Sequence, residues 1–295
     1  MIVRPVAMSL VVAAAASTAM ARAQSQTSVF RSTSDAVSVD VSVRSGSRPV
    51  RGLRPDDFRL SDNGVPQKVE VVTTESLPLD VSLVLDVSAS VRGPLLGRLK
   101  AGVEDVARRL NSSDRLRLLA VSSSVREVFD FHIGGVVPSL TNLEGSGSTS
   151  LFDGVIAALV KTRAADRRHL IVAFTDGRDT ASFFDAKTVA DIALKTDSVV
   201  HFVVGEPGLA ANAGDDREVT RLGALASTTG GQILPIDLNS SIAEAFKRVI
   251  DDFRTSYVLR YRPELVTPAG WHEIAVTVTR SGRFDVRARK GYFGG

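Results

Sequence analysis

The stretch LDVSLVLDVSAS, residues 79–90, decides the fold of this chain. Its first eight residues are rich in Leu and Val, as expected of a β-strand that is covered on both faces, and such strands are typical of parallel sheets. One carboxylate, Asp86, ends this run, and two hydroxyls, Ser88 and Ser90, follow it at two-residue steps. Because ligands of open α/β sheets bind beyond the carboxyl ends of the strands, this pattern predicts a functional site there.

Strand-like and helix-like segments alternate about five times after this stretch. The apolar residues of 94–110 share one helical face, and the short apolar runs at 169–177 and 199–205 are typical of buried strands. The pattern predicts a doubly wound, mostly parallel, Rossmann-like α/β sheet over residues 77–255.

Two all-β segments flank the α/β region. Valine alternates with polar residues over 37–43, which is the period of a half-buried strand. The pair Asn63-Gly64 predicts a tight hairpin, because both positions tolerate positive φ. Segments 27–76 and 256–295 each contain few strands for an independent fold. We therefore expect them to pair into one β-sandwich with the α/β domain inserted between its halves; two separate small β units are the alternative.

The first 23 residues resemble a secretory signal peptide. An Arg precedes an apolar run, and Ala21-Arg22-Ala23 predicts cleavage after Ala23. The apolar run is shorter than the roughly 20 residues that span a bilayer, and no later segment is long enough. We expect an exported protein that is periplasmic, extracellular or at the cell surface. We expect no membrane span after signal cleavage.

The composition excludes several classes of site. The 295 residues include no cysteine, so disulfides, thiolate metal sites and lipid attachment at a Cys are excluded. The formal charge of +3 includes two Arg of the expected leader, without which 34 basic side chains face 33 acidic ones. Since no basic cluster is rich in aromatic residues, we expect no nucleic-acid partner.

Oxygen ligands occur at three strand ends or adjoining loops. Asp86, Ser88 and Ser90 lie at the first, Thr149 at the second and Asp176 at the third. We expect them to converge at the carboxyl edge of the sheet. Three hydroxyls and two carboxylates, without His or Cys, are ligands for a hard divalent cation and do not suit Zn²⁺ or copper. We expect Mg²⁺, with Ca²⁺ or Mn²⁺ as alternatives.

The charges of these ligands predict a binding role. Two carboxylates only neutralise a divalent cation, so the ion should keep an open position and attract an Asp or Glu carboxylate of a protein partner. The isolated site should be weak, around the millimolar end of the range known for extracellular Ca²⁺ modules. We therefore expect the metal to control binding rather than to hold the fold together.

The same residues resemble a known family. The stretch DVSAS at 86–90, Thr149 and the stretch TDG at 175–177 are similar to the metal-ion-dependent adhesion site (MIDAS) of von Willebrand factor type A (vWA) domains. The resemblance implies that the three hydroxyls contact the metal directly and that the two carboxylates contact it directly or through water. The flanking stretches at 52–69 and 286–293 resemble exported, acidobacterial-type VWFA-related proteins, and both ends of that pattern are present, which implies a complete chain.

Other acidic residues near these motifs have different expected roles. Asp153 should lie in the first turn of a helix and interact with its dipole. Asp179 could support the metal ligands from behind, and it is the candidate for the general base of a hydrolase. The four histidines are scattered, and no G-x-S-x-G or phosphate-binding motif occurs. We therefore expect that the protein is not an enzyme. Two alternatives to the adhesion-type module remain: an assembly scaffold whose metal site is closed by self-association, and a less favoured metal-assisted hydrolase. The sequence predicts no oligomeric state.

Overall fold

The computed structural model describes most of the chain after the expected leader. The expected signal peptide, 1–23, and the beginning of the first expected β segment lie outside the described residues, as does Gly177. Contacts join Asp35–Gly295 into one unit. The described ranges are 36–72, 77–135, 137–161, 166–176, 178–205, 217–237 and 241–294.

Within these ranges, a six-stranded sheet forms the centre of the α/β region, in the order β11-β10-β9-β6-β7-β8. All neighbouring strands are parallel except β8, which pairs antiparallel with β7 at one edge. The expected doubly wound, mostly parallel sheet is confirmed, and all eight residues of β6 are buried. The strands are β6 (Leu79–Asp86), β7 (Arg115–Val121), β8 (Val125–Ile133), β9 (Arg168–Thr175), β10 (Val199–Gly205) and β11 (Ile233–Ile236).

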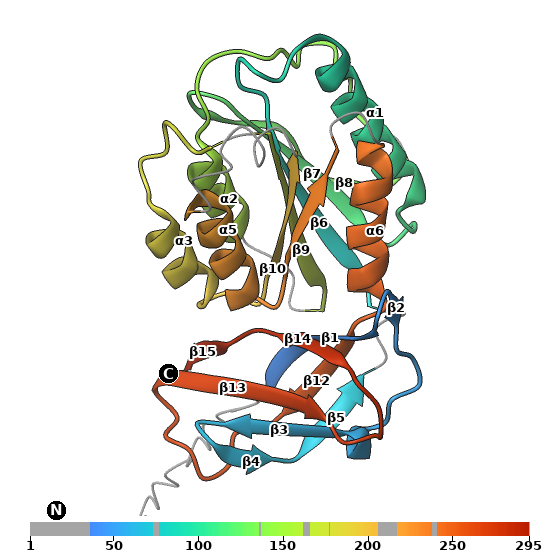
Figure 1. Ribbon diagram of the computed structural model, residues 1–295, viewed down its shortest axis with the longest axis vertical. Coiled ribbons are helices and arrows are strands. Elements are labelled where there is room, and N and C mark those ends of the chain that lie inside the picture. Colours follow the sequence, from blue (N-terminus) through green and yellow to red (C-terminus); the bar gives the residue numbers. More distant parts are fainter. Residues whose placement is uncertain are drawn as a thin grey trace, which may run out of the picture. The chain divides into compact units, whose positions relative to one another are not determined.

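Helices cover both faces of this sheet (Figure 1). Alternate residues of β6 point to opposite faces: Leu83 packs in the core shared with α1 and α6, and Val84 in the core shared with α2, α3 and α5. None of the described helices is long and apolar enough to cross a membrane. The helices are α1 (Gly93–Arg109), α2 (Leu151–Leu159), α3 (Ala186–Ala193), α5 (Arg217–Thr228) and α6 (Ile242–Arg254).

The two flanking segments pair with each other. Strand β1 lies between β14 and β12 in one sheet, which continues to β5 and also includes β2, and the other sheet has the order β15-β13-β3-β4. Both sheets contribute to one apolar core. The expected β-sandwich is therefore confirmed. Its elements are β1 (Val37–Ser45), β2 (Arg48–Pro49), the 3-10 turn η1 (Pro55–Asp57), β3 (Phe58–Asp62), β4 (Val65–Gln67), β5 (Val69–Val72), β12 (Tyr257–Tyr261), β13 (Gly270–Val278), β14 (Asp285–Ala288) and β15 (Gly291–Gly294).

The predicted hairpin connects β3 to β4. Asn63 and Gly64 adopt φ values of 47° and 79°, the conformation that made this pair a hairpin signal. The side-chain oxygen of Asn63 also accepts the Glu273 N–H at 2.8 Å, which ties the turn to β13. The conformation of the turn and its contact with the distant strand β13 therefore favour the same pairing of β3 with its neighbours.

A buried arginine links the sandwich to the α/β region. Arg168, the first residue of β9, donates from Nε to Oδ1 of Asp40 on β1 at 2.8 Å. Its Nη2 donates to the Phe253 carbonyl at 2.9 Å and to the Ser256 hydroxyl at 2.7 Å. Burial raises the pKa of Asp40, and the charge of Arg168 offsets part of that rise. The ion pair therefore stabilises two groups that would be costly to bury alone.

Candidate metal centre

The candidate site lies where the chain leaves β6 and β9. These strands are neighbours, but β6 is followed in the chain by β7 on its other side, so the connections diverge at this point. Asp86 is the last residue of β6, and Asp176 directly follows Thr175, the last residue of β9. Because the two strands are parallel, both carboxylates lie at the same edge of the sheet.

The loop after β6 turns its hydroxyls toward both acids. The Ser88 N–H donates to Asp86 Oδ1 at 2.9 Å, which fixes the start of the turn. The Ser88 and Ser90 hydroxyl oxygens are 3.1 Å apart, and Ser90 donates to Asp176 Oδ1 at 3.0 Å. The two-residue spacing noted in the sequence thus connects the ends of two strands.

Thr149 approaches Asp86 from the loop before α2. Its Oγ1 lies 3.5 Å from Asp86 Oδ2, and Thr175 donates to that same oxygen at 2.9 Å. The structure therefore brings together all five residues singled out from the sequence. Thr175 is a sixth member of the cluster to which sequence reasoning assigned no role. Its position at a strand end, directly before Asp176, was the available signal.

Close backbone contact holds the Thr149 loop against the serine loop. The Ala89 N–H donates to the Gly147 carbonyl at 2.9 Å. A Cβ atom at Gly145 would lie only 1.8 Å from the Val91 carbonyl oxygen, and Gly147 has a φ of +75°. A side chain at Gly145 would push the two loops apart, and one at Gly147 would clash with Ser123 at a strained φ, so the glycines permit the convergence of ligands.

The site concentrates negative charge away from water. Asp86 is fully buried, and this burial raises its pKa, although hydrogen bonds from Ser88 and Thr175 favour the ionised form. The nearby charge of Asp176 adds to the rise, and burial also raises the pKa of Asp176. Two such carboxylates are a cluster whose charge a bound cation would neutralise.

The hydroxyl groups are essential to any metal-binding role of this cluster. Across the described residues, no group of three or more His, Cys, Asp or Glu side chains is placed to hold a metal ion. A cation at the carboxyl edge would therefore need Ser88, Ser90 and Thr149 as ligands beside the two acids. This donor set consists of oxygen alone and suits hard cations.

A family model agrees with this arrangement. The model of the von Willebrand factor type A domain matches residues 80–248, which is more than half of the chain and includes all five residues. The chain belongs to the von Willebrand factor type A domain family. The match begins within β6 and ends within α6, so it covers nearly all of the six-stranded sheet and its helices.

Solved structures share this vWA fold at low sequence identity. Proximal thread matrix protein 1 from the mussel byssus, described with a zinc-occupied MIDAS motif, matches with a TM-score of 0.52 and 15% identity over 66% of this chain and 50% of the mussel chain. A von Willebrand factor type A protein from Catenulispora acidiphila matches with a TM-score of 0.51 and 12% identity over 80% of this chain and 73% of that chain. This chain thus spans half of the mussel protein. Among curated proteins, none matches the sequence.

Asp179 does not join the five residues of this vWA site. Its Oδ2 accepts the Phe152 N–H at 3.0 Å, in the first turn of α2, and its Oδ1 accepts the Ser182 N–H at 3.1 Å. Both carboxylate oxygens therefore bind backbone amides and hold the loop after β9 against the start of α2. These contacts do not support the role of general base considered from the sequence.

Asp153 lies in the first turn of α2, as expected. Its carboxylate also accepts the N–H groups of Phe183 at 2.9 Å and Phe184 at 3.1 Å, from the loop that leads to α3. Sequence reasoning missed this contact because it joins residues about 30 positions apart. Asp153 thus positions a neighbouring loop of the vWA domain.

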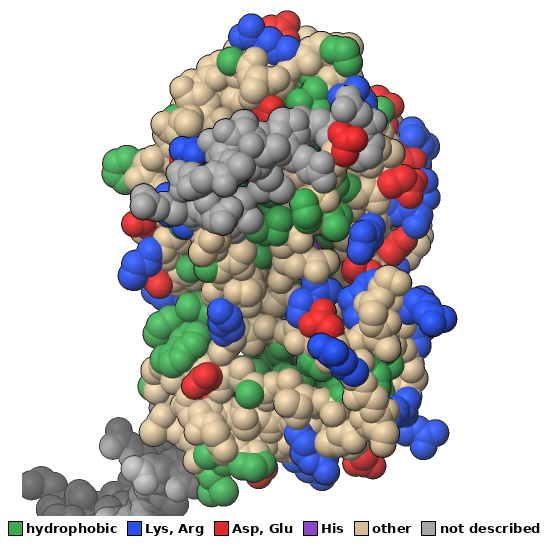
Figure 2. Space-filling view, in the orientation of Figure 1, with side chains coloured by type: hydrophobic (Ala, Val, Ile, Leu, Met, Phe, Trp, Pro, Cys, Tyr) green, Lys and Arg blue, Asp and Glu red, His purple; other side chains and the backbone are tan. Residues whose placement is uncertain are grey.

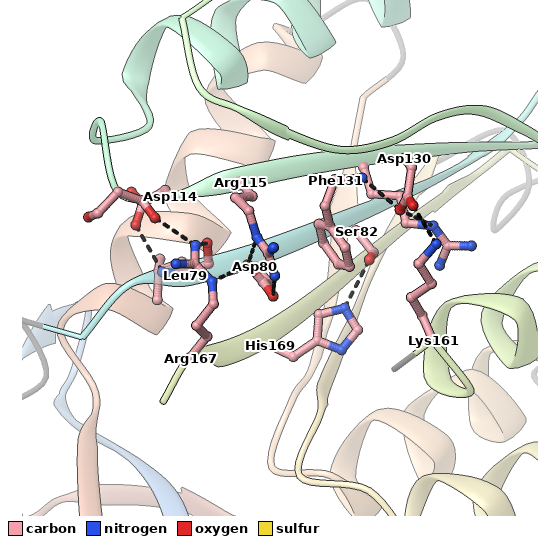
Figure 3. A network of polar contacts seen from close by, with 12 residues as sticks. Leu79, Asp80, Ser82, Asp114, Arg115, Asp130, Phe131, Lys161, Arg167 and His169 are labelled. Carbon is pink, nitrogen blue, oxygen red and sulfur yellow. Dashed lines mark hydrogen bonds and ion pairs between the residues drawn. The ribbon is translucent and has the colours of Figure 1, made fainter. Parts of the chain in front are cut away.

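A second polar cluster lies near the opposite, amino end of β6 (Figure 3). Burial would raise the pKa of Asp80, but hydrogen bonds from Arg115 and Arg167 outweigh that effect and lower it. Ser82 and His169 form a 2.9 Å hydrogen bond between β6 and β9. A serine–histidine pair can serve nucleophilic catalysis, but here both side chains are 1% exposed or less. This cluster therefore stabilises the sheet of the vWA domain.

Proposed function

We propose that this protein is an exported, metal-dependent module that binds a protein partner through the partner's Asp or Glu carboxylate. The observation that carries this proposal is the convergence of three hydroxyls and two carboxylates from three separate loops. The ligand set is Asp86, Ser88, Ser90, Thr149 and Asp176.

The all-oxygen ligand set favours a hard cation, and we propose Mg²⁺ as the ion. Mg²⁺ usually keeps several waters when it binds to one or two carboxylates, which suits a site that a partner's carboxylate completes. Mn²⁺ has similar ligand preferences and is a useful experimental substitute. The zinc in the mussel protein supports a divalent ion in this fold without identifying the ion used here.

The burial pattern supports an open side for the partner. Asp86 is fully buried, and Ser88 and Thr149 are nearly so, whereas Ser90 is exposed and Asp176 is half-buried. A divalent cation held by these residues would supply residual positive charge toward one oxygen of an incoming carboxylate. Because the buried ligands block the inner side, the carboxylate would approach from the solvent side, where Ser90 is exposed.

The surroundings of the site favour binding over catalysis. Asp179, the candidate for a general base, binds backbone amides. The hydrogen bonds of His169 and His272 go to Ser82, Ser198, Asp62 and Tyr292, none of which belongs to the site. General acid–base catalysis needs a titratable group within hydrogen-bond reach of the substrate, so these contacts support a non-enzymatic role.

Surface charge and the leader motif support the class of partner and the compartment. Lys and Arg side chains are interspersed with Asp and Glu on the face shown in Figure 2, with no continuous basic surface on that face. A mixed surface suits a protein partner better than a nucleic acid. The motif Ala21-Arg22-Ala23 supports export to the periplasm, the cell surface or the medium.

A capture experiment tests the proposed function. The immobilised protein should retain partners from bacterial envelope extract with Mg²⁺ and release them with a chelator. The Ser88→Ala/Ser90→Ala variant should retain none, and the exposed neighbour variant Ser148→Ala should behave as the parent. Equal capture by the parent and the double variant would contradict the proposal. Mg²⁺-dependent self-association in sedimentation, without capture of foreign protein, would instead support an assembly scaffold.

A further inference from the structure

Two phenylalanines are displayed on the loop between β9 and α3. Phe183 is 87% exposed and Phe184 is 39% exposed. Their rings pack edge to face, with centroids 5.1 Å apart and planes at 88°. Single exposed apolar residues are common on protein surfaces, but a packed pair of exposed aromatic rings is a feature of binding surfaces.

The backbone beneath these rings is firmly held. Asp153 accepts the N–H groups of both phenylalanines, and Asp179 accepts the N–H of Ser182 just before them. The Ser182 hydroxyl in turn accepts the Asp153 N–H at 3.1 Å. Such a network fixes the backbone that carries the rings before any partner arrives, which lowers the entropic cost of binding to them.

The same loop touches a residue of the proposed metal site. The N–H groups of Thr180 and Ala181 both donate to the Thr149 carbonyl at 2.9 Å, and the Thr149 N–H donates to the Thr180 hydroxyl at 3.0 Å. Phe183 is three positions after Thr180, so their Cα atoms are at most about 11 Å apart. A peptide whose carboxylate is bound at the site could therefore contact the aromatic pair with a side chain only a few residues away from that carboxylate.

We infer that Phe183 and Phe184 form an apolar subsite beside the metal site, and this inference rests on the proposed function. The partner is then a protein segment in which an exposed Asp or Glu has a bulky apolar side chain two or three residues away. The carboxylate supplies the metal-dependent contact, and the apolar side chain covers the exposed rings. Buried aromatic contacts of this kind contribute much of the energy at protein interfaces.

Short peptides separate the two contacts. In the presence of Mg²⁺, NMR titration would compare acetylated, amidated Gly-Asp-Gly-Phe-Gly with Gly-Asp-Gly-Gly-Gly and Gly-Asn-Gly-Phe-Gly. The phenylalanine peptide should bind the parent about fivefold more tightly than the glycine peptide, and the asparagine peptide should not bind. Phe183→Ala/Phe184→Ala should bind both Asp peptides equally. Phe293→Ala, which alters an exposed aromatic residue of β15, should keep the preference.

The outcomes distinguish the subsite from the proposed function. Mg²⁺-dependent binding of both Asp peptides with equal affinity to the parent would overturn the subsite and leave the metal site standing. Absence of Mg²⁺-dependent binding of either Asp peptide would contradict the proposed function, and the subsite with it. If the double phenylalanine variant only abolished self-association in sedimentation and kept the peptide preference, the aromatic pair would be a contact between copies of the chain.

Discussion

Among the five residues of the site, Thr149 has the hydroxyl with the longest hydrogen-bond contact, and we expect this hydroxyl to serve the metal. Its Oγ1 is 3.5 Å from Asp86 Oδ2, longer than a normal hydrogen bond between oxygens, although the side chain is almost fully buried. A buried hydroxyl with one long contact is poorly satisfied within the protein. A cation ligated by that oxygen would satisfy it.

Thr149→Val should therefore weaken metal binding with little effect on folding. The substitution keeps the shape of the side chain and removes the hydroxyl, so we expect the dissociation constant for Mn²⁺ to rise at least about tenfold. Electron paramagnetic resonance of free Mn²⁺ measures this directly. The neighbouring Ser148→Ala is the matched control, and equal affinity in the two variants would argue against Thr149 as a ligand.

The buried His201, outside the candidate site, should make the free energy of unfolding depend on pH. Burial lowers the pKa of His201 to about 3, with a further effect of the positive charge of Arg287. The unfolded chain, with a histidine pKa near 6.5, therefore binds a proton that the folded protein excludes, and stability falls as the pH drops below about 6.5. We expect a loss of about 1 kcal/mol from this group between pH 7.5 and 5.5.

Urea denaturation at the two pH values measures this effect. The variant His201→Gln, whose side chain does not titrate, should show a smaller loss of unfolding free energy over the same interval than the parent. Identical pH dependence in parent and variant would mean that folding does not shift the pKa of His201. His201 lies on β10 and is not one of the candidate metal ligands. The measurement therefore needs no added metal.

At the scale of elements, the site is built by the end of β6 and by three loops, which follow β6, precede α2 and follow β9. Most of the site residues followed from the sequence because they stand directly after apolar strands, and Thr149 followed because it stands just before a predicted helix. The partners did not follow: the bond from Thr175 to Asp86 depends on β9 lying beside β6, and Asp153 and Asp179 bind amides about 30 residues away. Strand order and loop packing are tertiary properties that one strand's pattern does not contain.

Gly145 tests whether the approach of the two loops matters. In Gly145→Ala the new Cβ would clash with the Val91 carbonyl, so the loop that contains Thr149 must move away from the serine loop. We expect about tenfold weaker Mn²⁺ binding with an unchanged far-UV circular dichroism spectrum. Gly97→Ala, on an open face of α1, is the control. Parent-like affinity in Gly145→Ala would show that the loops can separate without loss of the site.

At the scale of the whole molecule, the chain leaves the sandwich, forms the α/β domain and returns. This path was predictable because period-two strands occur on both sides of a run of buried strands and helices. The polar contacts that join the two regions were not predictable, because the sequence does not show that Asp40 and Arg168 meet in the fold. The charges of this largely buried pair are tolerated because both members meet in the fold.

Arg168→Met should destabilise the protein by about 3 kcal/mol, because it leaves the largely buried Asp40 without its partner. The double variant Arg168→Met/Asp40→Asn should recover part of that loss. As a control, Lys187→Met removes an exposed pair with Asp191 and should change the unfolding free energy by less than about 0.5 kcal/mol. Urea denaturation measures all three, and a parent-like Arg168→Met would contradict the structural role of the pair.

The most direct measurement is an anomalous difference map from a crystal of the protein soaked in Mn²⁺. The account predicts a peak at the carboxyl edge of β6 and β9, within ligand distance of the hydroxyl oxygens of Ser88, Ser90 and Thr149. A map without a peak there, in which these hydroxyls still hydrogen-bond to one another and to Asp86 and Asp176, would contradict it.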